Sequence, residues 1–247
     1  MNHFSRLASA LLAATLATPA MATPNIPGEA CPAFLTVQNA DCTVSLVTRC
    51  EGDNTGTTTS MLFDASGLLF TASSDGQGGW LESYDADTNV YETTTGKPVD
   101  PVSLDDLLRD GVDTYDFLLS HSEAGQTRTL RVVGADMLTS DELRIDNVTL
   151  LAVSTDLRIL EEDGAINYQT RGRQYVSPKM RLWFLGTDSV LGEDGSVTNY
   201  DSSPVKFIFP GEPGFGDTTP RFGCSAAPEH GDETAPMPTG PGANTNK

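Results

Sequence analysis

Short apolar or β-branched runs alternate with turn residues along most of the chain, from Cys31 to Cys224. A two-residue period is clearest in Thr129–Val133 and in Arg181–Leu185. This period is typical of β-strands that bury one face. The predicted strands are Phe34–Gln38, Thr43–Arg49, Thr58–Asp64, Leu68–Ser73, Gly79–Tyr84, Val90–Thr93, Thr114–His121, Thr127–Val133, Val148–Thr155, Leu157–Glu161, Ile166–Thr170, Lys179–Gly186 and Lys206–Phe209.

The residues between these runs favour tight turns. Asp64–Gly67 and Glu162–Gly164 supply residues that tolerate positive φ, and Leu160–Ile166 has the pattern of a hairpin. A large antiparallel sheet has to close on itself or be covered, because its edges otherwise expose unpaired backbone groups. We therefore expect an all-β fold, a large antiparallel curved sheet or open barrel with one short helix. A two-sheet β-sandwich is the alternative.

One segment has helical periodicity, Pro101–Gly111. Ser103 is a suitable N-cap and Gly111 a suitable C-cap. Leu104, Leu107 and Leu108 share one face of the predicted helix. We expect this face to pack over an opening of the sheet.

The two ends of the chain differ from the middle in composition. Residues 1–22 combine a short basic start, an apolar run and a small-x-small end at Ala22, which predicts a signal peptide and export to the periplasm or the medium. Residues 23–224 are expected to form a single β-rich domain. Residues 225–247 contain no aromatic residue and no Val, Ile or Leu, which predicts a disordered tail. No later segment is apolar for long enough to predict a membrane span.

The four cysteines, Cys31, Cys42, Cys50 and Cys224, predict two disulfides in an exported protein. A strand between Cys42 and Cys50 would hold them about 26 Å apart, whereas a disulfide needs Cα atoms within about 7 Å. A hairpin around Asn39–Asp41 would bring Cys31 near Cys50. The preferred pairing is therefore 31–50 with 42–224, and 31–42 with 50–224 is the alternative.

The chain is strongly acidic, with a formal net charge of −19. Nucleic-acid binding requires basic patches, so this charge argues against a nucleic-acid partner. The simplest interpretation of this charge is that it keeps the protein soluble. The alternative is that it serves to bind a cationic partner or a divalent metal.

Few residues are suited to nucleophilic catalysis. The chain has no G-x-S-x-G elbow, no H-E-x-x-H motif, no P-loop and no dinucleotide fingerprint. His121 is the one histidine within the predicted domain, and we expect it to face solvent near a turn. Asp85–Asn89 resembles the start of a calcium loop but lacks the glycine and glutamate of an EF-hand, so ordinary turn chemistry is expected. No catalytic residue, metal ligand or cofactor is predicted.

Paired carboxylates are the hardest catalytic class to exclude in an acidic chain. Glycosidases place two of them beside an aromatic sugar platform. Trp80, Glu82 and Tyr84 alternate within one predicted strand and would share a face, where Trp183 and Glu161 or Glu162 would join them. A carboxylate-dependent glycan hydrolase is therefore one alternative function, and a purely structural envelope protein is another.

The missing catalytic motifs, the all-β pattern and the amphipathic helix together favour a non-enzymatic role. We expect an exported domain whose curved sheet binds a small apolar ligand or an envelope protein. The candidate ligand-lining residues are Phe70, Trp80, Phe117, Leu119, Trp183 and Phe207.

Overall fold

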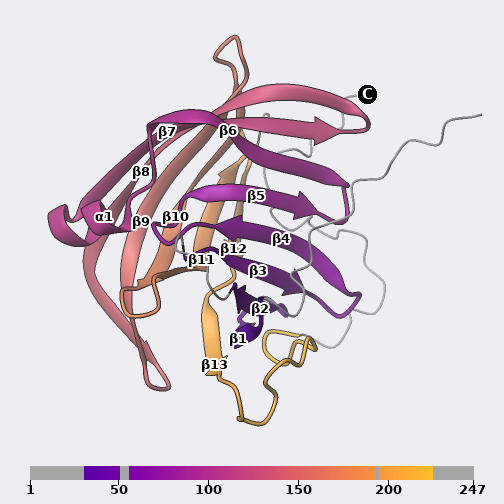
Figure 1. The fold of residues 1–247 in the computed structure, drawn as a ribbon, viewed down its shortest axis with the longest axis vertical. Helices are drawn as coiled ribbons and strands as arrows, with labels where there is room; N and C mark the ends of the chain where they lie inside the picture. The colour runs from indigo at the N-terminus through magenta and orange to yellow at the C-terminus, as the bar shows by residue number, and fades with distance from the viewer. Residues whose placement is uncertain (1–30, 51–55, 193–194, 225–247) are drawn as a thin grey trace, which may run out of the picture.

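The computed structural model describes residues 31–50, 56–192 and 195–224. Within these residues, thirteen strands form one antiparallel sheet that is not closed (Figure 1). This architecture confirms the predicted curved sheet or open barrel, and the two-sheet sandwich is not found. The predicted signal peptide (1–22) and the predicted disordered tail (225–247) lie outside the described residues. No described helix combines the length and the apolar character that a membrane crossing requires.

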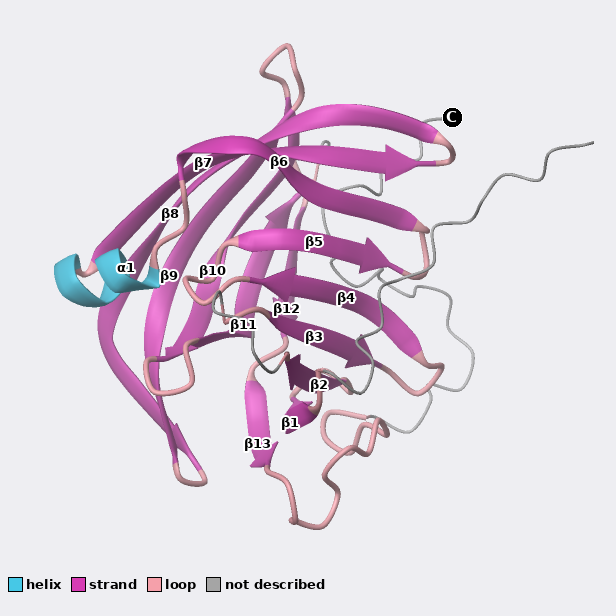
Figure 2. Cartoon of the chain, in the orientation of Figure 1, coloured by secondary structure: helices cyan, strands magenta, loops and turns pink. Residues whose placement is uncertain are grey.

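Consecutive strands are neighbours from β1 to β12, and β13 returns to pair with β1. One short helix, α1, lies between β6 and β7 (Figure 2). The elements are β1 (Ala33–Asn39), β2 (Val44–Arg49), β3 (Thr58–Phe63), β4 (Leu68–Ser74), β5 (Trp80–Asp85), β6 (Val90–Asp100), α1 (Leu104–Asp110), β7 (Val112–Glu123), β8 (Gln126–Ile145), β9 (Val148–Leu160), β10 (Ile166–Ser177), β11 (Leu182–Leu191), β12 (Val197–Asp201) and β13 (Pro204–Ile208).

The strands are longer than the apolar pattern predicts, most clearly in β9. Val148–Thr155 and Leu157–Glu161 were expected to be two strands, but the structure joins them into one. Asp156 does not interrupt the strand because its side chain faces outward and accepts a hydrogen bond from Arg171 on β10 at 2.7 Å. A polar residue on the solvent face of a strand is compatible with the ladder. Strand β12 was not predicted at all.

The two edges of the sheet belong to consecutive strands. β12 pairs with β11, β13 pairs with β1, and only Ser202 and Ser203 separate the two strands along the chain. Ser202 N donates to Gly186 O on β11, and Ser203 O accepts from Ala40 N, which follows β1. The chain therefore crosses from one edge to the other within two residues, which keeps both edges short.

Both predicted caps of helix α1 are confirmed by the structure. The Ser103 hydroxyl accepts a hydrogen bond from Asp106 N, and Gly111 adopts the left-handed conformation with φ of 78°. Leu104 and Leu107 are fully buried and pack with Val153 and Val176. The predicted apolar face of the helix thus covers part of β9 and β10.

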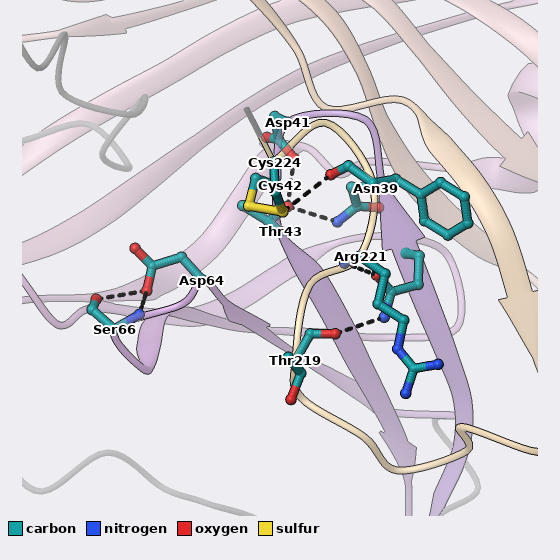
Figure 3. The surroundings of a disulfide bond; sticks show 11 residues. Asn39, Asp41, Cys42, Thr43, Asp64, Ser66, Thr219, Arg221 and Cys224 are labelled. Atoms are coloured by element: carbon teal, nitrogen blue, oxygen red, sulfur yellow. Dashed lines mark hydrogen bonds between the residues drawn. A yellow bond between two sulfur atoms is a disulfide. The ribbon is translucent and has the colours of Figure 1, made fainter. Parts of the chain in front are cut away.

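Both disulfides have the preferred pairing, Cys31–Cys50 and Cys42–Cys224. The second one fastens the segment after β13 to the β1–β2 turn (Figure 3). Cys42 N donates to Phe222 O, and Gln38 exchanges hydrogen bonds with Thr219 O and Arg221 N. Two disulfides fit a protein of an oxidising compartment.

The largest apolar cluster joins the two halves of the sheet. It combines residues of β1 and β2, such as Leu35 and Val47, with Leu150 of β9 and Phe184 of β11. Phe207 of β13 lies in the same cluster. The curvature of the sheet therefore brings its first and last strands together around a shared core, in keeping with the rolled shape in Figure 1.

Candidate ligand-binding cavity

A cavity of about 370 Å³ lies between the inner faces of β1–β5 and of β7–β11. Its volume is near the lower end of the range of about 300–1,000 Å³ for small-molecule sites. Most of its wall is apolar or aromatic. The aromatic lining residues are Phe70, Trp80, Tyr115, Phe117, Trp183 and Phe184, and the polar ones include Asn39, Thr58, Asp136, Thr155 and Gln174.

The structure brings four of the six predicted ligand-lining residues to this cavity, namely Phe70, Trp80, Phe117 and Trp183. The other two, Leu119 and Phe207, do not line the cavity but pack with aromatic residues that do. Leu119 is fully buried in the cluster around Phe117, and Phe207 packs edge-on against Phe184 with ring centroids 5.1 Å apart. Contact of any of these side chains with a ligand stays a prediction.

Two glycines leave room for aromatic rings close to the backbone beside the cavity. A Cβ on Gly134 would lie 2.4 Å from the ring of Tyr115, and a Cβ on Gly78 would lie 2.2 Å from Nε1 of Trp183. Any side chain at Gly134 or Gly78 would therefore displace one of these rings. Gly78 also has a positive φ of 87°, a conformation that glycine adopts without strain.

A register shift places Trp80 in the cavity. Ser73 pairs with Glu82 but Ser74 pairs with Trp80, so one extra residue is accommodated between the two pairs. Trp80 therefore faces inward, whereas Glu82 faces outward and accepts a hydrogen bond from Tyr91 at 2.6 Å. The expectation that Trp80, Glu82 and Tyr84 share one face was wrong, because this β-bulge reverses the alternation.

Asp136 of β8 is the one acidic residue among the described residues that line the cavity. It is only 5% exposed, and it stands opposite Asp113 on β7 and Thr155 on β9. Burial raises the pKa of the Asp136 carboxyl to about 6, and the negative charge of Asp113 adds to this shift. The Thr155 hydroxyl beside it lowers the pKa and offsets only part of the effect.

The side chains of Asp136 and Thr155 are hydrogen-bonded to each other. Two other buried polar atoms of lining residues, the Nε1 atoms of Trp80 and Trp183, lack hydrogen-bond partners among the described residues. Buried polar groups are nearly always paired in folded proteins, and an unpaired one costs about 1–3 kcal/mol. The presence of two such atoms around one cavity is the feature that most distinguishes it from ordinary core.

Sequence reasoning missed Asp136, although a signal for it was present. Leu130 and Val132 face inward on β8, and continuing the same two-residue period along the strand leads to Gly134 and Asp136. An isolated acidic residue on the inward face of a strand was the available signal.

His121 was expected to face solvent, and this expectation was wrong. His121 and Glu92 are each 1% exposed, and His121 Nδ1 lies 2.8 Å from Glu92 Oε1. Ser83 donates to the other oxygen of Glu92 at 3.3 Å. Burial raises the pKa of the Glu92 carboxyl, although its hydrogen bond with His121 opposes that shift. The order of these groups, with the carboxylate between serine and histidine, does not activate the serine, because a nucleophilic serine needs the histidine as its direct neighbour.

A second depression, with a volume of about 640 Å³, extends over strands β8–β12. It is lined mainly by polar residues, among them Ser154, Arg173, Asp188 and Asn199. Burial raises the pKa of the Asp188 carboxyl, and the Thr170 hydroxyl donates a hydrogen bond to it. This depression is larger, but it lacks the aromatic wall and the unpaired polar atoms that mark the inner cavity.

Metal binding receives no support within the described residues, where no group of three or more His, Cys, Asp or Glu side chains could hold an ion. In the segment that resembles a calcium loop, Asp85 Oδ1 accepts hydrogen bonds from Thr88 N at 2.8 Å and Thr88 Oγ1 at 2.7 Å. These bonds are typical of an Asx turn.

Comparison of the chain with protein-family models, with curated proteins and with solved structures finds no match.

Proposed function

We propose that this protein binds a small apolar ligand in the cavity between β1–β5 and β7–β11. The observation that carries the proposal is an aromatic cavity of about 370 Å³ whose wall also contains unpaired buried polar atoms. Ligand sites in proteins combine a largely apolar surface with a few polar groups that orient the ligand. Together with the predicted signal peptide, this favours an exported binding protein of the periplasm or the medium.

The cavity volume limits the size of the ligand. An apolar cavity of about 150 Å³ is enough to hold benzene, and the cavity here is a little more than twice as large. A single short chain or a fused pair of rings would fill it. A whole phospholipid would not fit within this volume.

Tryptophan fluorescence offers a direct test, because the chain has two tryptophans and both line the cavity. Titration with the neutral probe N-phenyl-1-naphthylamine should shift or quench their emission in a saturable way. Native mass spectrometry of protein from its own cells should also show a retained small molecule. If neither a saturable change nor a retained molecule is seen, the proposal is wrong and the structural alternative gains support.

A pair of matched variants separates cavity binding from surface binding. Ser60 lines the cavity on β3, whereas Ser140 is exposed on β8. Ser60→Phe should weaken probe binding by at least about tenfold, because the added ring occupies cavity volume that the probe needs and extra bulk in a confined site is costly. Ser140→Phe adds the same side chain outside the cavity and should leave binding unchanged. Equal effects of the two variants would contradict the assignment of the cavity.

The cavity gives less support to a glycan hydrolase. That chemistry needs two carboxylates about 5–10 Å apart beside the substrate. Asp136 is the one acidic residue among the described lining residues, and the carboxylate of its cross-strand neighbour Asp113 accepts a hydrogen bond from Ser103 N at 2.9 Å. Glu161 is paired with Arg128 at 3.0 Å.

A further inference from the structure

The charged groups of the cavity wall are all of one sign. Asp136 lines the cavity, and no Lys, Arg or His is among the described lining residues. Asp113 lies directly opposite Asp136 on the neighbouring strand and is also 5% exposed. The negative charge of Asp113 acts on Asp136 in the same apolar surroundings. A carboxylate in such surroundings gains most from a positively charged partner.

The aromatic part of the wall is suited to the same partner. Trp80, Tyr115, Phe117 and Trp183 line the cavity together with Asp136. Aromatic faces attract cations, and cages of aromatic rings are a common way to bind ammonium groups. The remaining apolar residues, such as Leu62 and Leu157, provide a surface for an uncharged body.

From these observations we infer that the ligand is an apolar amine, whose ammonium group binds Asp136 and whose hydrocarbon body fills the aromatic cavity. This inference rests on the proposed function and adds the chemical class of the ligand. The carboxylate of Asp136, which lines the cavity, would accept hydrogen bonds from the ammonium group. The strongly acidic chain, with its net charge of −19, would attract such a cation from solution.

An anionic ligand is the main competing class, because the Nε1 groups of Trp80 and Trp183 are unpaired donors. Two features oppose it. Trp183 Nε1 lies against the backbone of Gly78, and an anion would enter a site that already holds Asp136 without any basic residue of the described wall to neutralise it. Like charges in low-dielectric surroundings repel strongly.

Three ligands of equal chain length test the inference on the unmodified protein, namely n-octylamine, 1-octanol and octanoate. Tryptophan emission is followed at about pH 8, where an alkylamine is protonated and a buried aspartate of this kind is ionised. Octylamine should bind about tenfold more tightly than octanol, through its ion pair and cation–π contacts, and octanoate should bind most weakly.

Two variants with the same change in net charge provide the control. Asp136→Asn should reduce octylamine binding to the level at which the same variant binds octanol. Asp87→Asn removes one negative charge at an exposed turn position and should keep the preference for the amine. A cooperative urea-unfolding transition of Asp136→Asn shows that this variant is folded.

The outcomes separate this inference from the proposed function. Equal binding of the three ligands, or tighter binding of octanoate, would overturn the amine and leave the apolar cavity in place. A preference for octylamine that survives Asp136→Asn would overturn the role of Asp136. Binding of none of the three would overturn the amine and count against the proposed function as well.

Discussion

At the scale of single residues, burial controls the charge state of the carboxyls on the inner face of the sheet. Asp136 and Glu92 are both almost fully buried, and burial is the largest cause of the raised pKa of each carboxyl. They differ in their partners, because Glu92 is hydrogen-bonded to His121 whereas the side-chain partner of Asp136 is Thr155, which cannot carry a positive charge. This difference makes Asp136 the candidate binding group and His121–Glu92 a structural pair.

Asp136 should make the stability of the protein depend on pH. Its pKa of about 6 in the folded state lies above the ordinary value of 3.8, so the folded state binds the proton more tightly. The free energy of unfolding should therefore fall as pH rises from about 4 to 6, by on the order of 3 kcal/mol from this group. Asp136→Asn should be more stable than the wild type at neutral pH and similar to it below about pH 4. Urea unfolding at both pH values measures this, and a constant difference across the range would contradict it.

The Glu92–His121 pair should be necessary for stability as a unit. His121→Leu leaves the Glu92 carboxyl buried with Ser83 as its remaining side-chain partner, which should lower the free energy of unfolding by about 3–5 kcal/mol. Replacing both residues with leucine removes the unpaired charge and should recover part of that loss. Chemical denaturation of the two variants provides the comparison, and a double variant that is no more stable than His121→Leu would argue against a paired role.

At the scale of elements, the β7–β8 pair shows how strand register forms the cavity wall. Tyr115 lies opposite Gly134 and Asp113 opposite Asp136, so an aromatic ring and a carboxyl come from adjacent inward positions. The ring of Tyr115 covers Gly134, where a Cβ would come within 2.4 Å of it. Because Gly134 on β8 has no side chain, the ring of Tyr115 on the neighbouring strand β7 can occupy the space beside it.

Gly134→Ala should disturb both stability and the cavity. The added methyl group has to push Tyr115 aside, at a cost of about 1–3 kcal/mol in the free energy of unfolding. The same substitution should cost much less in a Tyr115→Leu background, because the ring is then absent. Thermal or urea unfolding of the four proteins in this double-mutant cycle gives the coupling between the two positions. Additive effects would show that the ring and the glycine do not interact.

At the scale of the whole molecule, the rolled sheet is held by links between its beginning and its end. The Cys42–Cys224 disulfide spans 182 residues, whereas Cys31–Cys50 spans 19. Arg49 at the end of β2 donates to Met180 O in the turn between β10 and β11 at 2.8 Å. Phe207 N on β13 donates to Asp146 Oδ2 in the β8–β9 turn at 3.1 Å.

The long-range disulfide should stabilise the protein more than the local one. Loop-closure entropy predicts a loss of about 5 kcal/mol for removal of Cys42–Cys224 and about 3 kcal/mol for Cys31–Cys50. The paired variants Cys42→Ala/Cys224→Ala and Cys31→Ala/Cys50→Ala can be compared by urea unfolding under oxidising conditions. A larger loss for the Cys31–Cys50 variant would show that local packing, rather than chain entropy, dominates.

The local pattern of apolar and polar residues was sufficient to predict much of the fold. The two-residue period of Thr129–Val133 correctly indicated a strand, and Ser103 and Gly111 correctly marked the ends of α1. The reach of an extended strand excluded the 42–50 pairing, and the predicted hairpin favoured the pairing that the structure has. Each of these features depends on neighbouring residues or on backbone dimensions, which is why the sequence reports them directly.

The residues of the candidate site could be identified only from the tertiary structure. The bulge that turns Trp80 inward depends on how β4 and β5 align, and the burial of His121 depends on its alignment with Glu92. Asp136, Trp80 and Trp183 come from β8, β5 and β11, which meet only because the sheet rolls up. The sequence by itself determined most of the strands and the helix caps and favoured one cysteine pairing, since these follow from local periodicity and chain geometry. Only the tertiary structure decided which side chains surround the cavity, because register and curvature are collective properties of all thirteen strands in the described chain.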